Sequence, residues 1–135
     1  MEPLLRLQDL HIGFRKAGQV NLVVRGIDLE IGENETVALV GESGCGKTVT
    51  AQSVLRLYPE RWIAYPRGRV LFEGRDILAM DLEQVRRIRG DRISMVFQEP
   101  MSSLNPLHTV QKQLGETLLL HRCLLYTSDA ADDLL

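Results

Sequence analysis

The sequence predicts an α/β fold in which an antiparallel β subdomain is followed by a strand, a glycine-rich loop and a helix. Three short apolar, partly alternating runs come first, at residues 4–14, 20–24 and 27–31. Gly18 and Gly26 separate these runs, which is typical of antiparallel strands joined by turns. A continuous apolar run at residues 37–40 predicts a strand buried on both faces. Residues 47–57 contain neither Gly nor Pro and predict a helix.

The remaining elements alternate between strand and helix signals. We expect a loop at residues 58–68, a strand at 69–72, a helix at 81–88, a strand at 93–97, a loop at 98–106 and a helix at 109–122. Asp81 is the expected N-cap of the first of these helices, and Gly90 is expected to end it. Val110, Leu114 and Leu118 share one face of the last helix, which predicts an amphipathic helix.

Composition places the chain among ordinary soluble globular proteins. Hydrophobic residues make up 44% and charged residues 25% of its 135 residues. The formal charge of -2 gives no electrostatic indication of a nucleic-acid partner. The start, MEPLLRLQDL, lacks the cationic and apolar regions of a secretory signal, and no apolar run is long enough to cross a bilayer. These observations favour a cytosolic or peripheral protein.

A phosphate-binding motif follows the strand expected at residues 37–40. The segment GESGCGKT at residues 41–48 fits the pattern G-x-x-x-x-G-K-[ST]. Glycines let the backbone approach an anion, and a helix N-terminus directs N–H groups and positive potential at it. Lys47 supplies a cation for the β- and γ-phosphates, and Thr48 supplies a hydroxyl for Mg²⁺. The alternative is a glycine-rich turn with an exposed lysine. The strand predicted before the loop and the helix predicted after it favour the phosphate-binding interpretation.

The loop together with RISMVFQEPMSSLNPLHTV resembles the nucleotide-binding domain of ATP-binding-cassette (ABC) transporters. The segments GESGCGKT, FQEPM and SLNP are most similar to those of the peptide, nickel and glutathione importer branch. Within it, the closest similarity is to the ATPases of bacterial oligopeptide and microcin C uptake. The resemblance covers about residues 4–122. It implies an ABC-type P-loop NTPase core with an antiparallel β subdomain.

The resemblance assigns roles residue by residue. Phe14 matches the aromatic residue that stacks on adenine, although an aromatic there is also compatible with simple core packing. Gln98 matches the glutamine of the Q-loop, a catalytic residue and Mg²⁺ ligand, and the alternative is a polar loop residue. Lys47 is the second expected catalytic residue, and Thr48 the second metal ligand. The expected ATP-binding residues are Phe14, Gly41, Glu42, Ser43, Gly44, Cys45, Gly46, Lys47, Thr48 and Val49.

Other conspicuous residues have simpler interpretations. Cys45 stands where the family more often has Ser, and we interpret it as a neutral substitution although its cationic surroundings favour thiol reactivity. Glu99 and Pro100 begin the segment that, by the resemblance, faces the permease. Trp62 and Tyr65 are expected to anchor a loop.

Several parts of the family's catalytic site have no counterpart in the sequence. The chain contains no LSGGQ-type signature and no later strand ending in Asp-Glu, and none of its three histidines matches the switch histidine. Residues 123–135, CLLYTSDAADDLL, resemble a translated sequencing adapter. We therefore expect residues 1–122 to be the N-terminal, truncated part of an ABC domain and residues 123–135 to be a non-native tail, the alternative being an evolved acidic tail. We also expect residues 37–40 to expose an unpaired apolar edge and to promote aggregation.

The implied function is the ATP-binding subunit of an importer, an ATP hydrolase when complete and inactive as the present chain. The implied cofactors are ATP and Mg²⁺. The implied partners are transmembrane permease subunits, a second ABC ATPase domain in another chain or in tandem, and indirectly an extracytoplasmic solute-binding protein, at the cytoplasmic face of the bacterial inner membrane. Three alternatives remain open: a module that binds Mg-ATP without turnover, a soluble ABC protein without a membrane partner, and another P-loop enzyme such as a kinase.

Overall fold

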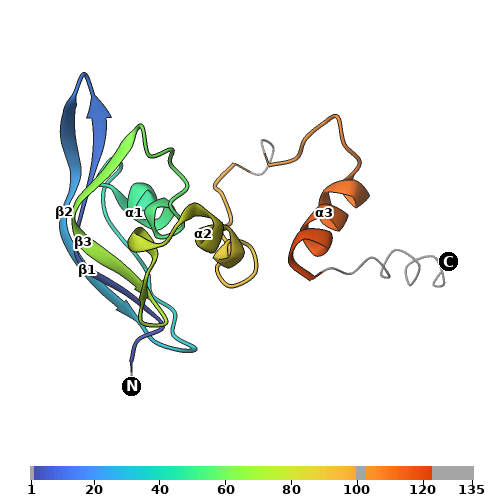
Figure 1. Ribbon diagram of the computed structural model, residues 1–135, viewed down its shortest axis with the longest axis horizontal. Helices are drawn as coiled ribbons and strands as arrows, with labels where there is room; N and C mark the ends of the chain where they lie inside the picture. Colours follow the sequence, from blue (N-terminus) through green and yellow to red (C-terminus); the bar gives the residue numbers. More distant parts are fainter. Residues whose placement is uncertain (1, 100–102, 123–135) are drawn as a thin grey trace. The chain divides into compact units, whose positions relative to one another are not determined.

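The computed structural model of the chain describes residues 2–99 and 103–122 (Figure 1). The chain divides into two compact units, Met1–Val85 and Arg86–Leu135.

The first unit is built on an antiparallel sheet with the strand order β2-β1-β3-β4. The strands are β1 (Leu5–Lys16), β2 (Gln19–Ile31), β3 (Ile63–Phe72) and β4 (Arg75–Asp76). Ala17 and Gly18 form the turn between β1 and β2, with φ values of 50° and 77°. Two positive φ angles in a two-residue turn match the right-handed twist of a hairpin. The predicted antiparallel β subdomain is confirmed.

β2 is a single strand where the sequence predicted two. The runs 20–24 and 27–31 are joined through Gly26, whose φ is 74°. The pairing with β1 shifts register between Leu10 and His11, opposite this glycine. A glycine in a left-handed conformation bends a strand at a bulge without ending it, so Gly26 did not act as the break that we expected.

β3 begins earlier than predicted, because the loop expected at residues 58–68 ends at Trp62. Pro66 lies inside the strand. It falls between the pairs His11–Arg67 and Gly13–Ala64, where the register with β1 is irregular. A missing N–H is tolerated at such an irregularity, and Pro66 is therefore compatible with the strand.

The core of the first unit lies between the sheet and the helical segments beside it (Figure 1). Helix α1 (Lys47–Val54) confirms the predicted helix but ends three residues earlier, and it buries Thr50, Ser53 and Val54. The short helix η1 (Ile77–Ala79) follows β4. The fully buried apolar side chains come from β1, β3, η1 and α2 (Leu82–Ile88): Leu7, Leu10, Ile12, Val70, Ile77 and Val85. β2 and α1, the elements before and after the glycine-rich loop, contribute the buried residues Val24 and Val54.

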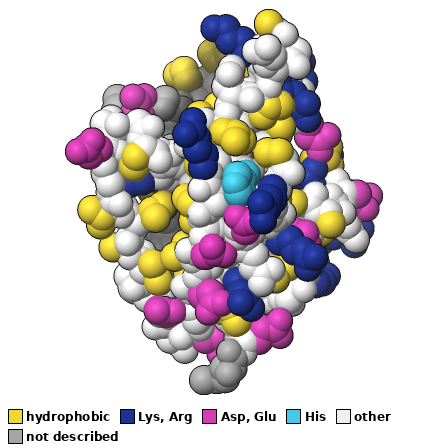
Figure 2. All heavy atoms as spheres, turned by 90° about the vertical axis from the view of Figure 1, so that its left-hand side faces the viewer, with side chains coloured by type: hydrophobic (Ala, Val, Ile, Leu, Met, Phe, Trp, Pro, Cys, Tyr) yellow, Lys and Arg dark blue, Asp and Glu magenta, His cyan; other side chains and the backbone are white. Residues whose placement is uncertain are grey.

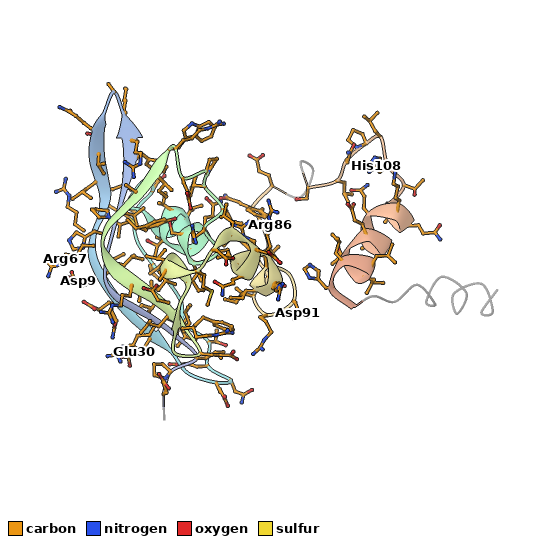
Figure 3. The ribbon with its side chains drawn as sticks, in the orientation of Figure 1. Asp9, Glu30, Arg67, Arg86, Asp91 and His108 are labelled. Atoms are coloured by element: carbon orange, nitrogen blue, oxygen red, sulfur yellow. The ribbon has the colours of Figure 1, made fainter. Side chains whose placement is uncertain are left out.

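The other face of the sheet carries many charged side chains. Figure 2 shows basic and acidic side chains together with hydrophobic ones over it, and Figure 3 shows Asp9 and Arg67 on this side. Arg67 Nε lies 2.5 Å from Asp9 Oδ2, and Arg6 Nε lies 2.8 Å from Glu30 Oε1. Exposed pairs of this kind contribute about 0–1 kcal/mol each, so this face adds solubility more than stability.

The apolar run at residues 37–40 is the main departure from the predicted fold. It forms no strand, and Val40 is 88% exposed. A strand needs a neighbour to pair with its N–H and C=O groups, and within the described residues this run has none. The prediction of a strand buried on both faces is wrong, whereas the predicted exposure of an apolar edge is confirmed.

The strand predicted at residues 93–97 is also wrong, for the same reason. Only Ile93 makes a bridge, to Arg89, and Val96 is 97% exposed. Helix α2 (Leu82–Ile88) spans the boundary between the units and confirms the helix predicted there. Its N-cap is Asp81 as expected, because Gln84 N donates to Asp81 Oδ1 at 2.8 Å and Asp81 N donates to Gln84 Oε1 at 3.1 Å.

Helix α3 (Val110–Arg122) confirms the last predicted helix. Its apolar residues Val110, Leu114 and Leu118 are exposed in the structure. Gly90, at φ 80°, ends the turn after α2 as predicted, and a Cβ there would lie 2.5 Å from His121 Nε2. No helix within residues 2–99 and 103–122 is long and apolar enough to span a membrane.

The exposed apolar edge carries a prediction about the chain in solution. We expect the 135-residue chain to self-associate, because Leu39 and Val40 present apolar side chains and unpaired backbone groups together. Val40→Lys should reduce the association, since a charge on an exposed edge opposes pairing. Size-exclusion chromatography with light scattering measures it. A wild-type chain that is a cooperatively melting monomer would contradict the expectation.

Candidate functional site

The segment at residues 41–48 forms a loop that leads directly into α1. Gly44 and Gly46 have φ values of 82° and 95°. Gly46 is the N-cap of α1, and among the described residues no side-chain cap hydrogen bond is made at this end of the helix. These N–H groups therefore stay available at the positive end of the helix dipole, which is the arrangement that binds anions.

The two inner glycines are needed for different reasons. A Cβ on Gly46 would lie 2.9 Å from Val24 Cγ2 and 3.4 Å from Val23 O, so the loop packs closely against β2 there. A Cβ on Gly44 would meet no atom within 4 Å, so only its φ of 82° calls for glycine. Gly46 fixes where the loop joins the sheet, whereas Gly44 permits the turn of the backbone.

Lys47 closes the loop through its side chain. Its Nζ donates to Gly41 O at 2.5 Å and to Glu42 O at 2.6 Å. The remaining contact of Nζ is Cys45 Sγ at 3.4 Å. An ammonium group has three donors and sulfur is a weak acceptor, so a phosphate oxygen can take the third N–H without displacing the two carbonyls. The lysine is therefore held in the loop with one donor ready for an anion.

Five further residues of the predicted ATP-binding set are exposed or half-buried. Thr48 is exposed, so its hydroxyl is accessible to solvent at the start of α1. Cys45 is an exposed free thiol whose Sγ would lie 2.6 Å from a Cβ on Gly41. The thiol thus occupies the space that glycine leaves open at Gly41. Glu42 and Ser43 are exposed at the tip of the loop, and Val49 is half-buried in α1.

Phe14 lies in β1, half-buried, and is paired with Asn21 of β2 and Ile63 of β3. Its ring makes a T-shaped contact with Tyr58, with centroids 5.4 Å apart and planes at 84°. Tyr58 carried no signal in the sequence, because the contact joins residues that are far apart in the chain. The structure thus adds an aromatic neighbour to the candidate adenine platform.

Gln98 belongs to the second unit and is exposed in the loop after residues 93–97. Glu99 beside it is exposed as well, and Pro100 lies outside the described residues. The joint position of Gln98 and Thr48 at one metal ion stays a prediction. Within residues 2–99 and 103–122, no three His, Cys, Asp or Glu side chains gather as a metal-binding group.

The sequence of the chain matches a family model that includes this loop. Residues 24–135 match the family model described as ABC transporter. The chain belongs to the ABC transporter family. Its fold is accordingly the ABC-type P-loop NTPase core with an antiparallel β subdomain, as the resemblance implied.

Curated relatives agree with this assignment. The chain is 46% identical over 123 residues to the peptidoglycan transport ATP-binding protein YejF of Agrobacterium fabrum, covering 91% of the chain and 22% of that protein. It is 50% identical over 121 residues to the uncharacterized ABC transporter ATP-binding protein YejF of Escherichia coli, covering 90% and 23%. It is 46% identical over 122 residues to the dipeptide transport ATP-binding protein DppD of Bacillus subtilis, covering 90% and 36%. The chain therefore spans between a fifth and two fifths of the length of these relatives.

The family match runs to residue 135 and so includes the segment interpreted as a non-native tail. That segment, residues 123–135, lies outside the described residues. Its interpretation stays a prediction.

Proposed function

We propose that the chain is the N-terminal part of an ATP-binding subunit of an importer, which couples ATP binding and hydrolysis to the uptake of peptides or related solutes. The observation that carries the proposal is the uncapped N-terminus of α1, framed by two glycines of positive φ and by Lys47. The names of the relatives, dipeptide and peptidoglycan transport ATP-binding proteins, support the solute class.

The residues of the first unit suit a nucleoside triphosphate. The N–H groups of Lys47, Thr48 and the glycines would bind the phosphates, and the third donor of Lys47 would reach an oxygen of the β- or γ-phosphate. Phe14 would stack on the adenine. Mg²⁺ would neutralise charge on the phosphates during transfer, and Thr48 together with Gln98 would be its protein ligands.

Hydrolysis needs more groups than this chain supplies. Phosphoryl transfer depends on positioned charge and a placed water molecule. The sequence has no signature motif and no Asp-Glu strand end, so we propose that the 135-residue chain binds MgATP without turnover. Titration calorimetry with MgATP and a phosphate-release assay on the same sample test this. Binding with no phosphate release is the expected result, and absence of binding would overturn the proposal.

Gln98 allows a prediction about the complete subunit. Gln98→Ala should lower the rate of ATP hydrolysis by about 10- to 100-fold, because the neutral side chain would orient the water or the metal ion during transfer. ATP affinity should change less than about threefold, since the phosphates are held mainly by the loop. Gln111→Ala is a matched control, an exposed glutamine of α3. Equal hydrolysis rates in both variants would contradict the role of Gln98.

The proposed partners follow from the same assignment. We propose transmembrane permease subunits, a second ABC ATPase domain, and indirectly a solute-binding protein, with the subunit at the cytoplasmic face of the inner membrane. Co-purification of the complete subunit with permease subunits from a membrane fraction tests this. Recovery of an active ATPase only from the soluble fraction would favour the alternative of a soluble ABC protein.

A further inference from the structure

The T-shaped contact between Phe14 and Tyr58 has not yet been given a role in ATP binding. In a T-shaped pair, one ring presents its edge to the face of the other. The ring planes of Phe14 and Tyr58 are at 84°. Whichever ring presents its edge, Tyr58 leaves at least one face of Phe14 uncovered. Contact with Tyr58 thus restrains the orientation of the Phe14 ring without covering both of its faces.

Tyr58 is itself connected to the helix that carries the phosphate loop. It lies four residues after the end of α1, and Leu57 N donates to Gln52 O of that helix at 3.2 Å. The ring contact between Phe14 and Tyr58 thus connects β1 to the segment that follows α1.

The backbone beyond Tyr58 is joined to the strand of Phe14. Trp62 N donates to Pro59 O at 2.9 Å, which closes the turn after Tyr58. Arg15 N donates to Trp62 O at 2.8 Å, and Arg15 Nε donates to Ile63 O at 3.2 Å. The residue that follows Phe14 thus holds the far end of this turn. Tyr58 lies in a short connection fixed at one end to α1 and at the other to β1.

We propose that Tyr58 is a positioning residue for adenine, which holds the Phe14 ring in a fixed orientation relative to the phosphate loop at the other end of α1. The inference rests on the proposed ATP-binding function and adds a residue to it. The ring of Tyr58 does this through its edge-to-face contact, and its hydroxyl is not required. Loss of the contact weakens binding of the base while the phosphates keep all of their partners.

The test compares a ligand that has the base with one that lacks it. MgATP and magnesium tripolyphosphate are titrated into the wild-type protein and into Tyr58→Leu, Tyr58→Phe and Trp62→Ala. Trp62 is the matched control, because it is a larger and exposed ring on the same turn whose neighbour is the guanidinium of Arg61, 5.0 Å from the ring centroid. Thermal melting followed by circular dichroism confirms that each variant is folded.

The expected result is specific to the base. Tyr58→Leu should weaken MgATP binding by about three- to tenfold, the range that corresponds to the loss of an aromatic pair. Its affinity for magnesium tripolyphosphate should stay within about twofold of wild type. Tyr58→Phe, which keeps the ring, should retain wild-type MgATP affinity, and so should Trp62→Ala.

Other outcomes overturn the inference. Equal weakening of both ligands by Tyr58→Leu would mean that the residue only supports the fold. Unchanged MgATP affinity, or the same loss in Trp62→Ala, would mean that the ring contact does not position the base. A wild-type protein that binds tripolyphosphate but gains nothing from the base contradicts the adenine platform itself, and one that binds neither ligand contradicts the proposed function.

Discussion

Replacing Lys47 with alanine is expected to weaken MgATP binding by about 10- to 100-fold, the range for losing a hydrogen bond from a charged group to phosphate. The substitution removes the donor that the loop leaves available for an anion. It also removes the contacts of Nζ to Gly41 O and Glu42 O, which hold the two ends of the loop together. Isothermal titration calorimetry with MgATP measures the loss.

Two control variants separate charge from a general surface effect. Lys112→Ala removes an exposed lysine of α3 and should leave MgATP affinity unchanged. Lys47→Arg keeps the charge but replaces a compact ammonium with a planar group, so it should recover only part of the affinity. The assignment of Lys47 would fail if Lys47→Ala bound MgATP within about twofold of wild type.

The phosphate loop was predictable because its signal is local. Spacing within eight residues defines the motif, and glycine is the residue that tolerates the φ values found at Gly44 and Gly46. The N-cap at Asp81 and the end of a helix near Gly90 were predictable for the same reason. In each case the residue that carries the signal also makes the local structure.

The failures concern elements that depend on distant partners. Residues 37–40 have the composition of a buried strand, but a strand exists only where another one pairs with it. Pro66 indicated a loop, and only the irregular register with β1 shows why it is accepted within β3. Gly26 indicated a break, yet it bends β2 at a bulge. Tyr58 could not be found from the sequence at all, since nothing local brings its ring to Phe14.

Of the candidate site, the structure describes two parts of the first unit. Residues 41–48 lead into the N-terminus of α1, and the Phe14 ring contacts Tyr58. Binding of phosphate and adenine at these two places stays a prediction. The metal-binding role of Gln98 stays a prediction, because it depends on how the two units meet.

The second large effect is expected at Gly46. Gly46→Ala should destabilise the protein by about 2–4 kcal/mol, because the new methyl group combines left-handed strain with overpacking in a close contact. The contact is with Val24 Cγ2, 2.9 Å from the position that a Cβ would take, and the φ of 95° adds the strain. Because Gly46 is also the N-cap of α1, MgATP affinity should fall by at least about tenfold as the first turn shifts. Urea unfolding and calorimetry measure the two effects.

Gly44→Ala is the matched control for this prediction. Its Cβ would meet nothing within 4 Å, so only the strain at φ 82° remains, about 1–2 kcal/mol. The steric part at Gly46 can be isolated by a double-mutant cycle with Val24→Ala, which removes the methyl group that the new Cβ would meet. The cycle should show a favourable coupling, so that Gly46→Ala costs less in the Val24→Ala background. Equal losses at Gly44 and Gly46, with no coupling to Val24, would mean that the loop tolerates a methyl group against β2 and that glycine is needed there for φ alone.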